Sequence, residues 1–205
     1  MKTKLFKFTI ILLLLLFSLG WIDSTDVESY LPLKDGKVWE YESLNLQGDK
    51  VIKRRKLTVT NMASREFEGK NVIPVKYLWR ETQFSSEIPF YFYFFVKSND
   101  SIYAFAKQSE KDIQPIKLDN PLTYIKLPIK QDNKWIDSAA ESIIESIDEN
   151  ITVPAGSFKC LRIKQTLKGG ISITVWYARD VGRVKQLLQS KNEKLLIQLL
   201  KYNKS

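Results

Sequence analysis

The sequence predicts a mainly β protein, with a single antiparallel sheet built from consecutive hairpins and at most one or two short helices. Residues 73–80 and 171–178 alternate with the period of two that is typical of a strand. Turn residues separate the strand-like segments by only two to five positions. Since a parallel crossover needs a dozen or more residues, these short connections favour antiparallel neighbours.

The strands can be assigned in order along the chain. In the first secure strand, Ile73, Val75, Tyr77 and Trp79 share one face. In the second, residues 171–178, the apolar face is Ile171, Ile173, Val175 and Tyr177, and Trp176 lies on the opposite face. Further strands are expected at residues 38–45, 50–60, 89–97, 101–107, 122–128, 151–153, 158–167, 183–190 and 194–202.

Residues 135–149 are ambiguous. Trp135, Ala139, Ile143 and Ile147 recur every four residues, as on a helix, but the two isoleucines also suit a strand decorated with serine and glutamate. We favour a strand from about residue 141, with room for a short helix before it.

Residues 1–20 have the pattern of a signal peptide. Three lysines precede an apolar segment from Phe8 to Leu19, and small residues at Ser18 and Gly20 favour cleavage after Gly20. The uncharged segment is about 15 residues long, whereas a transmembrane helix needs roughly 20. We therefore expect an exported protein, periplasmic or secreted, with residues 21–205 as a single antiparallel β domain; an uncleaved N-terminal anchor is the alternative.

The composition excludes several kinds of chemistry. The chain has no histidine and one cysteine, so Ser-His-Asp and Cys-His nucleophile pairs and the usual zinc sites are excluded. After removal of the leader, 29 basic and 23 acidic residues remain, a net charge of +6. Export also removes ordinary access to nucleic acid. We therefore expect no cofactor, no metal and no nucleic-acid partner.

Three local features have a structural interpretation. Cys160 lies within an expected strand, which favours a small core residue over an intermolecular disulfide. Glu40 and Glu42 lie two residues apart on one strand face, about 6.5 Å between Cα atoms, but Trp39 and Tyr41 would occupy the buried face. The two glutamates therefore fit a solvated surface better than a pair of hydrolase acids. Gly169-Gly170 lacks the context of a phosphate-binding loop.

The basic cluster Lys53-Arg54-Arg55-Lys56 has two interpretations. It could bind an anionic surface of the cell envelope, such as phospholipid headgroups. Alternatively, it is a solvated sheet edge or turn that lysine and arginine keep soluble.

The aromatic segment 89–95 is the strongest indication of a binding site. As a strand it places Phe90, Phe92 and Phe94 on one face, which we expect in the core, and Tyr91, Tyr93 and Phe95 on the other. The tyrosine face could line a groove for an acyl chain, a sugar or a partner strand; a strand buried on both sides is the alternative. The candidate ligand-binding residues are Tyr91, Tyr93, Trp79, Trp176 and Tyr103.

Three segments carry a family resemblance: residues 30–41, 151–160 and 175–185, the last two containing Val-Pro-Ala-Gly-Ser-Phe and Trp-Tyr-Ala-Arg-Asp-Val-Gly-Arg-Val-Lys. They resemble a group of uncharacterised bacterial exported and lipoprotein-like β domains. The resemblance implies a strongly curved antiparallel sheet or open barrel in the cell envelope, distantly similar to the barrels of lipoprotein carriers. It implies no catalytic residues, and this chain lacks the N-terminal cysteine of lipoprotein-like members.

Together these observations predict a non-enzymatic envelope protein whose curved sheet binds an apolar or amphipathic, lipid-like ligand or an envelope partner. Peripheral contact with an anionic membrane would fit the basic cluster. A structural or assembly component without a ligand, and a carboxylate-based hydrolase of envelope polysaccharide, remain as alternatives.

Overall fold

A computed structural model describes residues 27–81, 87–138 and 140–203. The expected signal peptide, residues 1–20, lies outside the described residues. The described elements are α2 (Val27–Tyr30), β1 (Val38–Gln47), β2 (Lys50–Asn61), β3 (Arg65–Phe67), β4 (Lys70–Glu81), β5 (Glu87–Lys97), β6 (Ser101–Ser109), β7 (Ile116–Lys126), β8 (Lys134–Ile136), β9 (Ala140–Val153), β10 (Gly156–Leu167), β11 (Ser172–Ala178), β12 (Gly182–Gln189) and β13 (Lys194–Tyr202).

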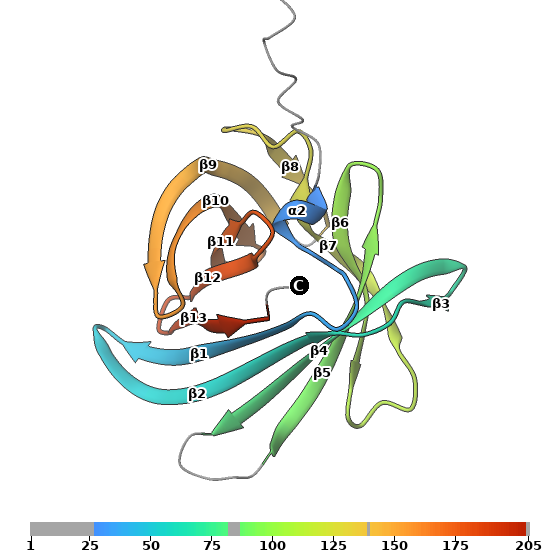
Figure 1. The fold of residues 1–205 in the computed structure, drawn as a ribbon, viewed down its shortest axis with the longest axis horizontal. Coiled ribbons are helices and arrows are strands. Elements are labelled where there is room, and N and C mark those ends of the chain that lie inside the picture. The colour runs from blue at the N-terminus through green and yellow to red at the C-terminus, as the bar shows by residue number, and fades with distance from the viewer. Residues whose placement is uncertain (1–26, 82–86, 139, 204–205) are drawn as a thin grey trace, which may run out of the picture.

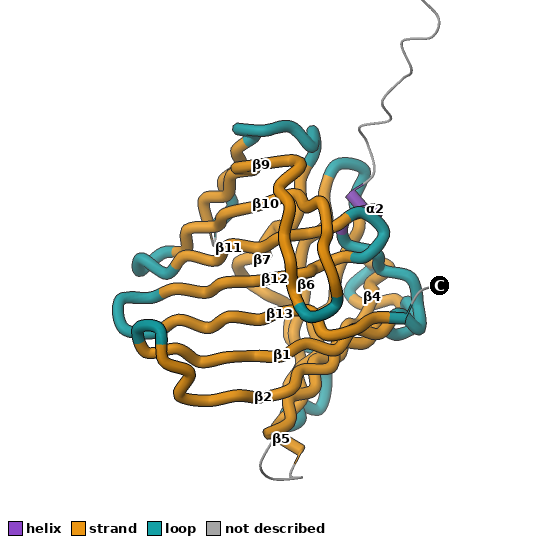
Figure 2. Tube along the Cα trace, turned by 60° about the vertical axis from the view of Figure 1, so that its left-hand side comes forward, coloured by secondary structure: helices purple, strands orange, loops and turns teal. Residues whose placement is uncertain are grey.

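The described strands form one antiparallel sheet that curls into a nearly closed barrel (Figure 1). The order across the sheet is β7-β6-β5-β4-β2-β1-β13-β12-β11-β10-β9-β8, and β3 pairs only with β4. Most neighbours are consecutive in the chain, as in a series of hairpins (Figure 2). The pairing of β1 with β13 joins the first and last strands. The predicted mainly β, antiparallel and strongly curved fold is therefore confirmed.

The barrel closes at a seam of side-chain hydrogen bonds between β7 and the strands at the other end of the sheet. The Gln165 side-chain amide donates to the carbonyl of Thr123 at 2.9 Å. The Thr123 N–H in turn donates to Asp137 Oδ2 at 2.8 Å. These bonds supply partners for backbone groups that would otherwise lack them at a sheet edge.

One end of the barrel is covered by the chain that precedes β1, which we call the strap (residues 27–37). The Asn61 amide donates to the carbonyls of Pro32 and Lys34, at 2.9 and 3.0 Å. The strap also packs closely on Gly182, where a Cβ would lie 3.3 Å from Pro32 Cδ and where φ is +95°. Glycine therefore suits this position for both space and backbone conformation.

A second, smaller cluster of hydrophobic side chains packs separately from the main hydrophobic core. Phe94 is fully buried in it, and Phe67 of β3 lies over the cluster with its ring centroid 6.2 Å from that of Phe94. Phe92 packs against the same cluster. On this face of β5, Phe94 is therefore buried and Phe92 is half-buried, beneath β3 rather than in the barrel interior, and the side chain of Phe90 lies outside the described residues.

The ambiguous segment is strand on both sides of residue 139. Lys134–Ile136 form β8, which pairs with β9, and β9 begins at Ala140. The favoured strand is thus confirmed, and the short helix allowed before it is wrong for residues 134–136. A spacing of four residues does not distinguish a helix from a strand, because every fourth residue of a strand also lies on one face. No helix in the described ranges is long and apolar enough to cross a membrane.

Candidate functional site

The inner faces of the strands enclose a cavity of about 350 Å³. This volume lies in the range of small-molecule sites, roughly 300–1,000 Å³. Its wall combines aliphatic and aromatic side chains with three polar ones: Leu57, Tyr77, Trp79, Tyr91, Tyr93, Leu122, Tyr124, Gln165, Ile173, Val175, Arg183, Gln186, Leu195 and Ile197.

The cavity extends toward the end of the barrel opposite the strap. Its lining residues Ile173 and Leu195 lie next to the β10–β11 and β12–β13 turns. Those turns and the β1–β2 turn lie at the same edge of the sheet, because Ser172 pairs with Gln189, Gln189 with Lys194, and Lys194 with Leu46. Tyr91 in the wall is 44% exposed, so solvent reaches the cavity on this side.

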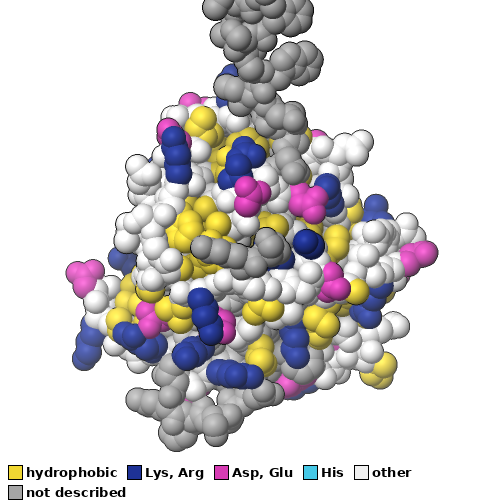
Figure 3. Space-filling model, viewed as in Figure 1, with side chains coloured by type: hydrophobic (Ala, Val, Ile, Leu, Met, Phe, Trp, Pro, Cys, Tyr) yellow, Lys and Arg dark blue, Asp and Glu magenta, His cyan; other side chains and the backbone are white. Residues whose placement is uncertain are grey.

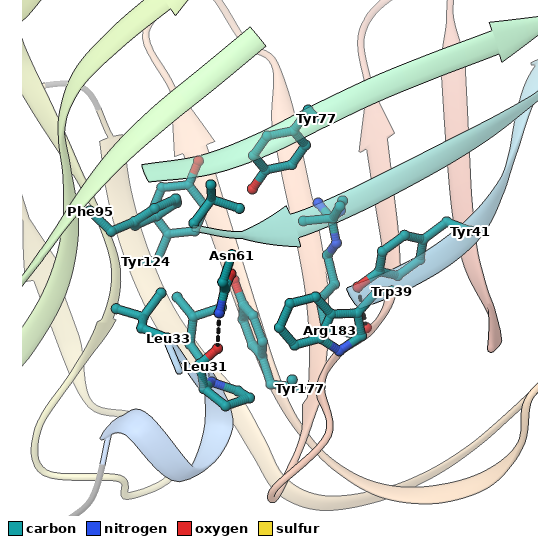
Figure 4. Close-up of a pocket in the computed structure, with 14 residues that line it drawn as sticks. Leu31, Leu33, Trp39, Tyr41, Asn61, Tyr77, Phe95, Tyr124, Tyr177 and Arg183 are labelled. Carbon is teal, nitrogen blue, oxygen red and sulfur yellow. Dashed lines mark hydrogen bonds between the residues drawn. The ribbon is translucent and has the colours of Figure 1, made fainter. Parts of the chain in front are cut away.

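A smaller pocket of about 40 Å³ lies between the cavity and the strap (Figure 4). Tyr77, Tyr124 and Arg183 line both spaces. We call these three side chains the polar floor of the cavity. Leu31 and Leu33 of the strap line the smaller pocket, and Phe95 lies beside Tyr124 with the ring centroids 5.0 Å apart (Figure 4).

Arg183 places a positive charge inside the barrel. Its guanidinium carbon lies 4.7 Å from the centroid of the Tyr41 ring and 5.9 Å from that of Tyr77. Its Nη1 donates to Gln186 Oε1 at 2.7 Å, and its main-chain carbonyl accepts a bond from the Tyr41 hydroxyl at 3.0 Å. In the part of the chain that the structure describes, no carboxylate lines the cavity or the smaller pocket.

The tyrosines near Arg183 are neutral at physiological pH. Burial raises the pKa of Tyr77 to about 12, although the nearby Arg183 charge acts in the opposite direction. Burial likewise raises the pKa of Tyr41, Tyr124 and Tyr177. The guanidinium is thus surrounded by aromatic rings and neutral polar groups rather than by an anion.

Three of the five candidate ligand-binding residues meet at the cavity: Trp79, Tyr91 and Tyr93 are in its wall. Trp176 is on the opposite face of β11 from Val175, with the Lys185 ammonium 5.0 Å from its ring centroid. Tyr103 packs against the outer cluster of Phe94 and Phe105. The structure therefore places these two away from the cavity.

The four basic residues 53–56 do not form one patch. Lys53 pairs with Glu81, and Arg54 pairs with Glu42. Arg55 lies on the same strand face as the cavity residue Leu57, with its guanidinium carbon 5.0 Å from the Trp79 ring centroid. Lys56 is exposed beside Arg55. Figure 3 shows acidic side chains among the Lys and Arg side chains that lie over β1 and β2.

The other features singled out in the sequence are structural. Glu40 pairs with Lys201 at 2.9 Å and Glu42 pairs with Arg54, so both carboxylates belong to ion pairs outside the cavity. Cys160 is fully buried, which confirms the core interpretation. Burial raises the pKa of its thiol to about 12, and the charge of Glu149 adds to this effect.

Sequence reasoning missed Arg183 and Gln186. Both follow Gly182 in β12, whose residues 183–189 show no apolar face in the sequence. A bulge at Val184 explains their position: Tyr177 pairs with Arg183 but Trp176 pairs with Lys185. The extra residue puts positions 183 and 186 on the same face, whereas a regular strand would put them on opposite faces.

Residues 142–199 match the model of the DUF3108-like family. This part of the chain resembles that family. The match includes two of the three motifs that carried the resemblance, residues 151–160 and 175–185, and so supports it. No curated protein matches the sequence.

Several solved structures are distantly similar to this chain. A candidate lipoprotein from Parabacteroides distasonis is 13% identical, with a TM-score of 0.42, over 84% of this chain and 97% of that one. A candidate exported protein from Bacteroides fragilis is 14% identical, with a TM-score of 0.42, over 84% and 98%. A LolA superfamily protein from Nitrosomonas europaea is 8% identical, with a TM-score of 0.37, over 87% and 89%.

Proposed function

We propose that this protein is a non-enzymatic, exported envelope protein whose barrel binds an apolar or amphipathic, lipid-like ligand. The observation that carries the proposal is the cavity of about 350 Å³, walled mainly by aliphatic and aromatic side chains from both halves of the chain. A filled barrel core would leave no such space, since protein interiors are packed as densely as organic crystals.

The binding energy would come from burying the apolar part of the ligand. Each 100 Å² of apolar surface removed from water contributes about 2.5 kcal/mol before the entropic cost of association. Leu57, Val175 and Ile197 supply aliphatic contacts, and Trp79 and Tyr93 supply aromatic ones. Only part of this gross energy would appear as affinity, so we expect micromolar rather than picomolar binding.

Charge at the mouth would help to attract an anionic ligand or membrane surface. Lys50, Lys168, Lys191 and Lys194 are exposed at or beside the three turns at the open end. Such a group of lysines raises the local concentration of anions at low ionic strength. Peripheral contact with an anionic membrane or docking to an envelope partner would use the same surface.

Export is part of the proposal and rests on the sequence pattern of residues 1–20. On this basis the signal peptide is removed after Gly20, and residues 21–205 act as a single β domain in the periplasm or outside the cell.

The proposal can be tested with N-phenyl-1-naphthylamine, a neutral dye whose fluorescence rises in apolar sites. Delipidated protein should bind the dye saturably, and decan-1-ol should displace it. Leu195→Trp should weaken dye binding about tenfold or more, because Leu195 lines the cavity and the larger ring fills it.

Leu196→Trp is the matched control, since the neighbouring residue of β13 points to the other face. It should bind the dye as the wild type does. Equal dye binding by the two folded variants, or no saturable binding by the wild type, would contradict the proposal.

A further inference from the structure

We propose that Arg183 binds the anionic head of the ligand inside the barrel, so that a single-chain carboxylate enters head first. This inference rests on the proposed function and adds the class of ligand and its orientation. It differs from attraction at the mouth, where the head would stay among the exposed lysines and the chain would point inward.

The first argument is the cost of an isolated charge. Arg183 is half-buried, so its guanidinium loses part of its hydration, which is costly unless other charges or hydrogen bonds compensate. The Tyr41 and Tyr77 rings and Gln186 compensate in part, since the face of an aromatic ring attracts a cation. A carboxylate on the cavity side would supply the missing opposite charge.

The second argument is the access that the guanidinium has to the cavity. Arg183 lines both the cavity and the smaller pocket, so its side chain lies at their boundary. Its Nη1 donates to Gln186, and Tyr41 is a second side-chain partner, so part of its donor set is still available on the cavity side. A guanidinium has five N–H donors in a planar fork, which suits bidentate binding of a carboxylate.

The third argument is the chemistry around the guanidinium. Tyr77 and Tyr124 complete the polar floor (Figure 4). With the pKa of both phenols raised by burial, their hydroxyls keep their protons and can donate hydrogen bonds to an anion. The site thus offers a fixed positive charge and two neutral donors, and no described acid lines it to repel a carboxylate.

Size restricts the head and the chain. The pocket beneath the floor holds only about 40 Å³, little more than one water molecule, so a bulky head cannot pass the floor. The cavity above it, about 350 Å³, suits one chain of medium length. A fatty acid carboxylate fits this combination.

The experiment compares decanoate with decan-1-ol, which have the same chain and different heads, as competitors of the dye. The wild type should prefer decanoate by about tenfold or more, as expected for a hydrogen-bonded charge pair. Arg183→Gln should lose this preference and still bind decan-1-ol. Arg183→Lys, which keeps the charge, should retain part of the preference.

The double variant Lys191→Gln/Lys194→Gln is the control for charge at the mouth. It removes two exposed lysines near the open end and should keep the preference for decanoate in buffer of physiological ionic strength, where exposed charges are screened. Loss of the preference here, with retention in Arg183→Gln, would place the head at the mouth and overturn the inference.

Orientation can be measured on the wild type alone, which matters if Arg183→Gln does not fold. A soluble paramagnetic chelate should relax the ¹³C-labelled carboxyl carbon of bound decanoate less than its terminal methyl carbon. Stronger relaxation of the carboxyl carbon would overturn the head-first orientation. Equal affinity for decanoate and decan-1-ol would overturn the anion site while leaving the proposed function intact, whereas binding of neither would remove the proposed function itself.

Discussion

At the scale of single residues, Arg183 is the feature that separates this interior from an ordinary apolar core. Alternation along two strands predicted that Tyr91 and Tyr93 share a face and that Trp79 shares a face with Tyr77, and all four line the cavity. The position of Arg183 could not be predicted, because it depends on the bulge at Val184. A period of two carries no information about an inserted residue.

The tyrosines of the interior predict a loss of stability in alkali. A phenol whose pKa is higher in the folded than in the unfolded state stabilises the folded state. This contribution is complete below the unfolded-state pKa, near 10, and is lost as the pH rises toward the folded-state pKa. For Tyr77 the window is pH 10 to about 12. The free energy of unfolding should fall across it, by on the order of 1–2 kcal/mol for Tyr77 alone.

Urea unfolding at several values between pH 9 and pH 11.5 measures this decline. Tyr77→Phe removes the ionisable group and should make the decline shallower than in the wild type. The same slope in both proteins would show that ionisation of Tyr77 does not contribute.

At the scale of elements, the long strands were predictable and the short or irregular ones were not. The expected strands 38–45 and 194–202 correspond to β1 and β13. β3 has three residues, too few for any period to be detected, and β7 begins at Ile116, six residues before the expected start at 122. The strap has no periodic pattern because separate hydrogen bonds hold it, among them those that the Asn61 side chain donates to Pro32 and Lys34 and the one that Asn203 donates to Gly36.

Asn61 should therefore contribute more to the stability of the fold than an asparagine usually does. It is 2% exposed, and Asn61→Ala would remove the side-chain donor to the carbonyls of Pro32 and Lys34, of which Lys34 keeps a long backbone bond from Lys37 at 3.4 Å. We expect a loss of about 2–4 kcal/mol in the free energy of unfolding, measured by urea denaturation.

Asn203→Ala is the matched control. The Asn203 amide also bonds the backbone, donating to the carbonyl of Gly36 at 2.9 Å, but it does so at an exposed position. Water can replace that bond, so the loss should be about 1 kcal/mol or less. A loss in Asn61→Ala no larger than in Asn203→Ala would show that the strap is held by other contacts.

At the scale of the whole molecule, curvature and closure depend on pairs of strands far apart in the sequence. β1 pairs with β13, and Gln165 bonds to Thr123 across the seam. No local pattern specifies such pairs; the family resemblance alone implied the curved sheet. The cavity could not be predicted either, since its volume is the space left between side chains of strands from both halves of the chain. The expectation of a ligand came instead from the tyrosine face of the aromatic strand.

The central claim is that this space holds an amphipathic ligand, and calorimetric titration of delipidated protein with decanoate at several temperatures tests it most directly. One molecule should bind per chain with a negative heat-capacity change, the robust sign of apolar burial. The heat of decanoate binding should persist in Leu196→Trp and disappear in Leu195→Trp. An absence of saturable heat in the wild type, or an unchanged signal in folded Leu195→Trp, would contradict the account.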